Sequence, residues 1–127
     1  MKKTKISFNT DKLVVYEKGG IVVHRYSDIV GIFCSRPYLQ IVTVDKRCML
    51  VIHCLKELER LLPSSFAQCS RSAIVNLEHA IQVKTENQNC VVHLKCGRKI
   101  DVSRRRKADV LMKYQNQTSF CSKDVIN

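Results

Sequence analysis

Cations are the side chains with the clearest chemical potential in this sequence of 127 residues. Lys and Arg number 22 against 11 Asp and Glu, which gives a formal net charge of +11. One stretch holds six cations and interrupts them only with Asp101: Arg98, Lys99, Arg104, Arg105, Arg106 and Lys107. A solvated face usually interleaves both signs, so this stretch indicates a surface that neutralises phosphates. We therefore expect a polyanionic partner, which is DNA, RNA or an anionic membrane surface.

Arg71 is a second candidate for such contacts, because Ser70 and Ser72 make it part of a compact cluster of donors. A guanidinium group fits the O6/N7 edge of guanine and also neutralises a phosphate. The alternative is a surface arginine paired with an acid such as Glu78. Asn76 follows two apolar residues on a predicted strand. We expect it to hydrogen-bond backbone and hold the Arg71 loop.

The cysteines indicate a reducing compartment. Their number, seven, is odd, and no segment resembles a secretion signal. The longest apolar run, residues 29–34, is too short to cross a bilayer. We expect a cytoplasmic protein whose thiols are reduced, with no membrane partner.

Neither a metal site nor an active site is predicted. The best metal pattern is Cys90-x-x-His93-x-x-Cys96. On a strand, residues 90 and 96 point to one face and residue 93 to the other, whereas zinc needs convergent ligands. The four histidines are scattered and no glycine-rich phosphate loop is present. The sequence therefore predicts a protein that is not an enzyme and needs no cofactor.

Cys69 allows two interpretations. It lies two residues from Arg71, and a nearby cation lowers the pKa of a thiol and exposes it to oxidation. Oxidation would then weaken binding of a nucleic acid. The alternative is a buried, inert thiol.

The elements that position these cations are mostly strands. Alternating or apolar segments predict strands at residues 13–16, 21–26, 28–34, 38–44, 48–53, 73–77, 80–85, 90–95 and 99–102. The strand at 28–34 is nearly all apolar, and we expect it to be central. Cys48 and Cys54 share parity with Leu50 and Ile52, which predicts that both thiols are buried.

Two helices complete the predicted layout. Leucines at helical spacing predict a middle helix over residues 55–62, and Pro63 ends it. Ser103 is a candidate cap for a short basic C-terminal helix whose Val110, Leu111 and Tyr114 dock on the body. The layout is that of one β-rich α+β domain. Its cationic loops fall after residue 34, before residue 73 and after residue 102.

Several of these segments share one ordered pattern, which runs as a leucine-bearing helix, Pro and Phe, an Arg-Ser pair and a Val-Asn-Leu strand. The residues that carry it are Leu55, Leu58, Leu61, Leu62, Pro63, Phe66, Arg71, Ser72, Val75, Asn76, Leu77 and Ile81. Residues 94–97 (LKCG) and 102–105 (VSRR) continue it downstream. This pattern resembles the LytTR family of bacterial DNA-binding domains, and the resemblance covers residues 11–114. The family usually has His where this sequence has Ser70.

The resemblance implies an elongated, mostly β fold whose loops enter DNA grooves from one face. It places Arg71 in the central Arg-Ser element, Arg104 and Arg105 in the C-terminal element, and residues 35–38 in the first contact loop. Together with the charge pattern, it gives these predicted DNA contacts: Arg36, Tyr38, Ser70, Arg71, Arg104, Arg105, Arg106 and Lys107. Residues 1–10 are then an N-terminal extension, and residues 115–127 a flexible C-terminal tail.

The function expected from the resemblance is that of a sequence-specific regulator of transcription that binds double-stranded DNA, on directly repeated sites. RNA polymerase or a separate sensor protein is an expected further partner, since only about ten residues precede the domain and leave no room for a receiver. Two alternatives stay open. One is an RNA-binding module, and the other is a protein-interaction antagonist of LytTR regulators.

Overall fold

The computed structural model describes residues 4–126, with side chains as far as residue 116. Eleven strands are present among these residues: β1 (Lys5–Phe8), β2 (Lys12–Glu17), β3 (Gly20–Arg25), β4 (Ile29–Ser35), β5 (Tyr38–Thr43), β6 (Cys48–Val51), β7 (Phe66–Ser70), β8 (Ala73–Asn76), β9 (Ala80–Glu86), β10 (Asn89–Leu94) and β11 (Lys99–Val102). The helices are α1 (Leu55–Leu61), α2 (Arg104–Ile126) and the short 3-10 turns η1 (Tyr26–Asp28) and η2 (Leu77–His79). The predicted class, mostly β with a middle and a C-terminal helix, is confirmed.

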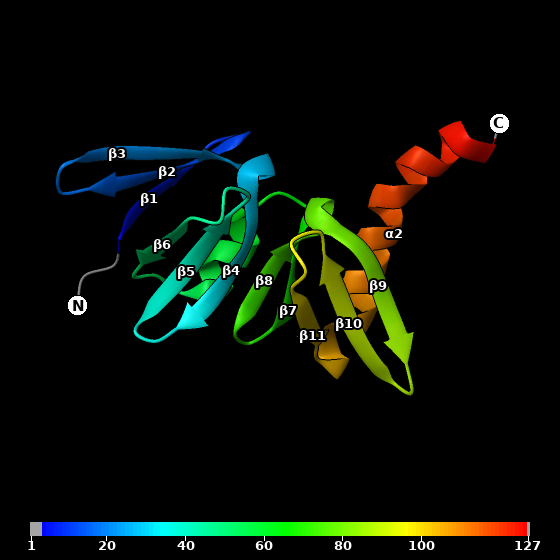
Figure 1. The fold of residues 1–127 in the computed structure, drawn as a ribbon. Helices are drawn as coiled ribbons and strands as arrows, with labels where there is room; N and C mark the ends of the chain where they lie inside the picture. The colour runs from blue at the N-terminus through cyan, green and yellow to red at the C-terminus, as the bar shows by residue number, and fades with distance from the viewer. Residues whose placement is uncertain (1–3, 127) are drawn as a thin grey trace.

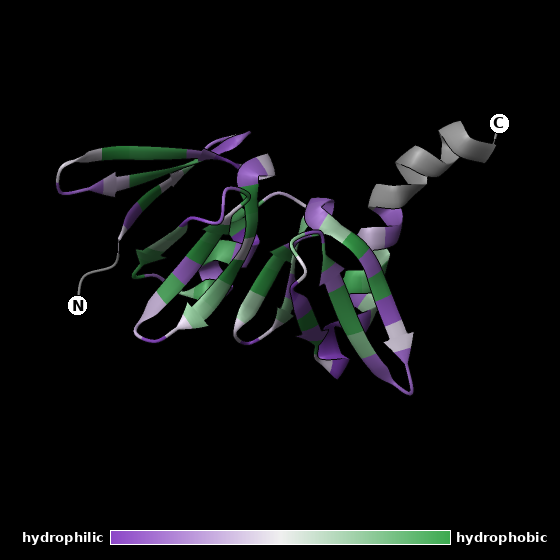
Figure 2. Ribbon diagram, in the orientation of Figure 1, coloured by the Kyte–Doolittle hydropathy of each residue, from purple (hydrophilic) through white to green (hydrophobic). Residues whose placement is uncertain are grey.

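The strands form three antiparallel sheets that follow one another along an elongated molecule (Figure 1). The first sheet has the order β1-β2-β3, the second β6-β5-β4-β8-β7, and the third β11-β10-β9. Strand β4 lies at the centre of the second sheet, as its apolar sequence predicts. Hydrophobic residues occur along strands of all three sheets, as Figure 2 shows.

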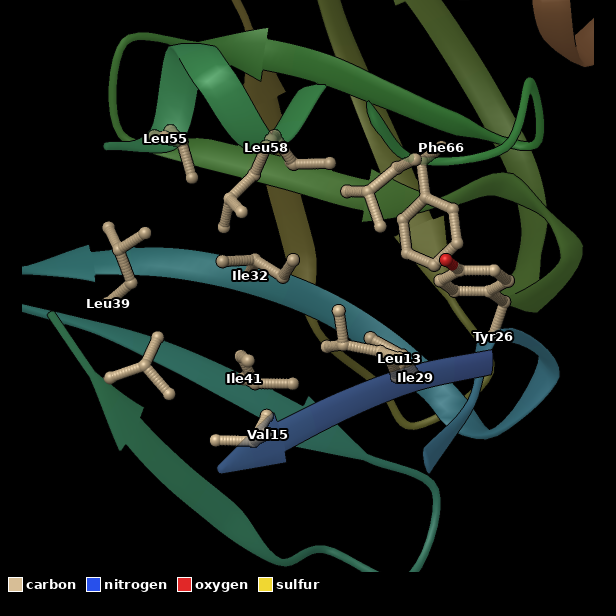
Figure 3. Packing of buried hydrophobic residues seen from close by; sticks show 13 residues of the cluster. Leu13, Val15, Tyr26, Ile29, Ile32, Leu39, Ile41, Leu55, Leu58 and Phe66 are labelled. Carbon is tan, nitrogen blue, oxygen red and sulfur yellow. The ribbon is translucent and has the colours of Figure 1, made fainter. Parts of the chain in front are cut away.

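Two cores hold the sheets together. The first joins β2 to one face of the five-stranded sheet and to α1 (Figure 3). Its centre includes Ile32, Ile41 and Leu58, which are at most 1% exposed. The ring of Tyr26 meets that of Phe66 edge to face at 6.1 Å. Leu55 and Leu58, which the leucine spacing placed on one face of the helix, are the buried residues of α1 and pack in this core, as predicted.

The second core lies between the other face of the five-stranded sheet, the third sheet and α2. It contains Cys69, Val75, Val92 and Val110, none of them exposed to solvent. Val110 and Tyr114 dock α2 on this core as predicted. Because the five-stranded sheet packs on both sides, β7 and β8 carry buried residues at nearly every position.

The structure differs from the prediction at both ends of the chain. Residues 5–8, assigned to an N-terminal extension, form β1 and pair with β2 from Lys5–Tyr16 to Phe8–Leu13. Helix α2 continues to Ile126 instead of ending near residue 114. The flexibility expected of residues 115–127 falls mostly outside the residues whose side chains the structure describes.

The second sheet also corrects two predictions. Strand β7 was not expected, because the buried run FAQCS has no alternation. The predicted burial of Cys48 and Cys54 is wrong: both are exposed, and Leu50 is 54% exposed. Met49 and Val51, the alternate residues of β6, face the first core instead, so the alternation was assigned to the wrong face of the strand.

Among the described residues, no helix has both the length and the apolar character that a membrane crossing requires.

Candidate nucleic-acid interface

The first cationic segment is the tight turn between β4 and β5. Ser35 pairs with Tyr38, so Arg36 and Pro37 form the two-residue connection. Tyr38 is 37% exposed at the start of β5. The predicted first contact loop is thus a hairpin tip at the end of the central sheet.

The second segment is the tip of the β7–β8 hairpin, where Ser70 pairs with Ala73 across Arg71 and Ser72. The backbone N–H of Ser72 donates to Oγ of Ser70 at 3.2 Å, and the two serine hydroxyls lie 3.3 Å apart. The side-chain amide of Gln68 donates to the carbonyl of Ser70 at 2.9 Å. These bonds fix the backbone that carries Arg71, so the serines hold the turn in shape.

Strand pairing brings these two tips together. Strands β4 and β8 are antiparallel neighbours with Phe33 opposite Ala73, so β4 ends where β8 begins. The backbone N–H of Cys34 donates to the carbonyl of Ser72 at 2.8 Å. Arg36 and Arg71 therefore lie at the same end of the sheet, on the adjacent β4–β5 and β7–β8 turns.

The third segment joins β11 to α2. The backbone N–H of Ser103 donates to the carbonyl of Cys69 at 2.8 Å, which ties this junction to the end of β7. Helix α2 begins directly afterwards at Arg104. The start of α2 thus lies beside the Arg71 hairpin, although more than 30 residues separate them in the sequence.

The three segments share one open groove of about 980 Å³, which we call the arginine groove. Six of the eight predicted contacts line it: Arg36, Tyr38, Ser70, Arg71, Arg105 and Arg106. The other two, Arg104 and Lys107, are not part of its lining. Lys107 is half-buried and acts electrostatically on the Cys90 thiol, which places it on the side of α2 that faces β10.

The groove also contains residues that the sequence did not single out. His53 and Cys54 line it from the connection between β6 and α1, Lys56 from the first turn of α1, and Gln68 from β7. Strand β6 ends opposite the start of β5, with Val51 paired to Leu39, so the chain reaches this end of the sheet again. Lys56, a cation in the first turn of α1, could have been predicted as a groove residue. In the sequence, however, a single lysine on a helix looks like an ordinary solvated residue.

The guanidinium groups of the groove are uncommitted. Within the described part of the chain, Arg36, Arg71 and Arg105 form no ion pair. The alternative partner of Arg71, Glu78, lies in η2 and lines hollows with Ser65 at the other end of β8. Several unpaired cations on one concave surface attract a polyanion, because the negative groups of the polyanion neutralise the charges of the arginines.

Asn76 holds a different segment from the one predicted. Its side-chain amide donates to the carbonyls of Tyr26 at 3.0 Å and Ile29 at 2.9 Å, and its Oδ1 accepts from the N–H of Glu78. Its structural role is therefore clear, but it secures the start of β4, at the end of the sheet opposite Arg71.

Cys69 is buried and cannot act as the predicted low-pKa thiol. Burial, the largest effect, and the nearby Cys90 thiol together raise the pKa of Cys69 to about 12, although Arg106 partly opposes them. The side chain has no exposed surface. The redox interpretation is therefore wrong, and the buried, inert thiol remains.

Three adjoining cationic segments at one end of a β scaffold define a class of protein, the domains that bind nucleic acid through loops. A family model described as the LytTr DNA-binding domain matches residues 19–115. The chain belongs to this LytTR family.

A solved structure has the same fold. It is the LytTr DNA-binding domain of a proposed methyl-accepting/DNA response regulator from Bacillus cereus, with a TM-score of 0.70 and 19% sequence identity. The match covers 83% of this chain and 97% of that one. A search of curated proteins found no match. The family and the fold establish a DNA-binding domain.

Proposed function

We propose that the protein is a sequence-specific regulator of transcription that reads double-stranded DNA with the arginine groove and the turns around it. The observation that carries this proposal is the convergence of Arg36, Arg71 and Arg105 on one surface, where none of them has a carboxylate partner among the described residues. Paired guanidinium donors suit guanine edges in the major groove, and neighbouring cations suit phosphates.

The residues divide by position into readers and anchors. Arg71 stands at a hairpin tip that is held by hydrogen bonds of Gln68, Ser70 and Ser72, so its backbone position is fixed. Arg105 is exposed on the first turn of α2. We assign Arg71 and Arg105 to base edges. Arg106, half-buried beside β7, is assigned to a phosphate, as a positioning contact.

Directly repeated sites are part of the proposal, because the resemblance to the LytTR family implies them. The β4–β5 turn, the β7–β8 turn and the start of α2 lie along one side of the elongated molecule (Figure 1). Two copies that bind side by side in the same orientation would meet two equal half-sites in direct repeat. Promoter occupancy, contact with RNA polymerase or control by a separate sensor protein would then convert binding into regulation.

Selection from a random pool of duplexes tests the proposal. We expect a preferred sequence to emerge, and Arg71→Ala to cost about 1–3 kcal/mol on that sequence while relaxing its preference. Arg25→Ala is the matched control, because Arg25 is an exposed arginine at the end of β3 in the first sheet and does not line the groove. It removes the same charge and should leave the preference intact.

The alternatives give other results. Recovery of no preferred duplex, with binding to a LytTR regulator instead, would support the antagonist. Preference for single-stranded RNA in direct competition would support an RNA module. That second alternative needs stacking surfaces, and among the described residues the groove lining offers only two aromatic side chains, Tyr38 and His53.

A further inference from the structure

A second groove lies at the other end of the central sheet, away from the arginine turns. We call it the valine groove, because Val30, Val42 and Val44 form its floor. It has a volume of about 610 Å³, within the range of sites that hold small molecules. Its walls come from the β5–β6 turn, from η2 and from the β10–β11 turn, which come together on the side of the molecule opposite the arginine-bearing turns (Figure 1).

The floor is apolar because the five-stranded sheet has core residues on both faces. On one face the first sheet and α1 cover it. On the other face the third sheet and α2 cover β7 and β8 but leave part of β5 and β6 bare. Leu50 of β6 is 54% exposed, and Val44, in the turn after β5, is 49% exposed and lines the groove. Exposed apolar surface that is bordered by polar residues marks binding sites more often than chance surface does.

The rim of the valine groove is cationic. Lys46, Lys95 and Arg98 line it, together with His79, and its lining contains no described carboxylate. Asp45, next to Lys46, is already engaged by the hydroxyl of Thr43 and by Arg47 at 3.2 Å. The charges on the rim therefore have no counter-ion in the groove.

The rim is also held in place before any ligand arrives. The guanidinium group of Arg98 lies 4.6 Å from the centre of the Phe33 ring. The backbone N–H of Lys95 donates to the carbonyl of His79 at 2.8 Å, and Leu94 bonds to Arg98 across the turn. Gly97 adopts φ +97, which lets this turn close. A rigid rim reduces the ordering cost of binding.

We propose that the valine groove binds a small amphipathic anion, a molecule that joins an apolar body to a carboxylate. The apolar body lies on the valines, and the carboxylate meets Lys46, Lys95 and Arg98. The match rests on charge: a purely apolar ligand would leave the cations unpaired, and a purely polar anion would leave the valines exposed to water.

Two thiols make this proposal testable at single-residue resolution. Cys48 and Cys96 are exposed and line the valine groove, whereas the exposed Cys54 lines the arginine groove at the other end. Alkylation with iodoacetamide, followed residue by residue with mass spectrometry, reports on both grooves in one sample. With decanoate present at ten times its Kd, we expect Cys48 and Cys96 to react about tenfold more slowly. Cys54 should react at its original rate.

Control ligands and variants define what is recognised. Decanol has the same chain without the charge, and acetate has the charge without the chain, so both should protect weakly. Lys95→Gln should weaken the binding of decanoate about tenfold, because it removes one charge-assisted hydrogen bond. Lys99→Gln is the matched control on the same hairpin, since Lys99 is exposed but does not line the valine groove.

Three results would overturn the proposal. Protection of Cys54 as strong as that of Cys96 would mean that decanoate binds cations in general. Equal protection by decanol would mean that the carboxylate is not recognised. Protection of Cys48 and Cys96 that rises with protein concentration, without any decanoate, would mean that a second copy of the chain covers the groove.

Discussion

At the scale of single residues, the same side-chain type serves different purposes according to its surroundings. Arg71 lies on an exposed hairpin tip and has no ion-pair partner among the described residues, whereas Arg98 stacks on the ring of Phe33. Cys69 is enclosed in the second core, whereas Cys54 is open to solvent. Sequence spacing placed Cys69 near Arg71 but could not show that the thiol is buried, nor that the cation acting on it is Arg106.

The raised pKa of Cys69 gives a prediction for alkaline pH. The unfolded thiol ionises near its ordinary pKa of 9.0 and the folded thiol only near about 12, so the folded state keeps its proton longer. The unfolded state therefore binds fewer protons in this window, and stability falls as pH rises from 9.0 towards 12. In Cys69→Ala the fall in the free energy of unfolding between these pH values should be smaller than in the wild type.

Denaturant titrations of the two proteins across this range measure the difference. Cys54→Ala serves as the control, because Cys54 is exposed. Parallel curves for wild type and Cys69→Ala would contradict the assignment.

Asn76 gives a second prediction at this scale. Its side chain is fully buried and bonds three backbone groups, so Asn76→Ala leaves the carbonyls of Tyr26 and Ile29 without these donors. We expect a loss of about 2–4 kcal/mol in the free energy of unfolding, measured with denaturant. A loss below about 0.5 kcal/mol, the size expected of a surface substitution, would show that the three bonds are not structural.

At the scale of elements, periodicity predicted those that have one exposed face. The spacing of its leucines predicted the helix over residues 55–62, whereas the central strand β4, which is buried on both faces, was predicted from its run of apolar residues. Strand β7 is buried on both sides and has no alternation to read. Strand β6 has apolar residues at both parities, and its solvent-facing side was chosen wrongly for that reason.

The packing of α1 provides a matched pair of substitutions. Leu58 is 1% exposed in the first core, whereas Leu61 is 53% exposed on the same helix. Leu58→Ala should lower the free energy of unfolding by about 2–5 kcal/mol, because it removes buried methyl groups and leaves a cavity. Leu61→Ala should change it by less than about 0.5 kcal/mol. Equal losses in a denaturant titration would mean that α1 packs through another face.

At the scale of the whole molecule, the sequence alone did not bring the cationic segments together. Charge spacing identified residues 98–107, and Arg71 was suggested by its serines. Their meeting depends on β4 pairing with β8 and on the bond from Ser103 to Cys69, which sequence distance does not reveal. The resemblance to the LytTR family supplied that arrangement in advance. It did not supply Lys56, His53 or Gln68, which enter the groove through the topology of β6 and β7.

The assignment of anchors belongs to this scale, because salt acts on all phosphate contacts at once. The logarithm of the binding constant should fall with the logarithm of salt concentration, by about 0.9 for each phosphate neutralised. Arg106→Ala should reduce this slope by about one and weaken all duplexes alike, whereas Arg105→Ala should mainly change sequence preference. Titrations at several salt concentrations measure both. An unchanged slope in Arg106→Ala would remove it from the phosphate contacts.

The central claim is that three distant segments face the same DNA, and amide chemical shifts test it most directly. A labelled sample of the protein is titrated with the selected duplex. The account predicts that residues 35–38, 70–72 and 103–106 shift together, at the same ratio of DNA to protein. The β2–β3 tip at Lys18 and Gly19 should stay unchanged. Shifts confined to one segment, or concentrated at residues 95–99 instead, would contradict the account.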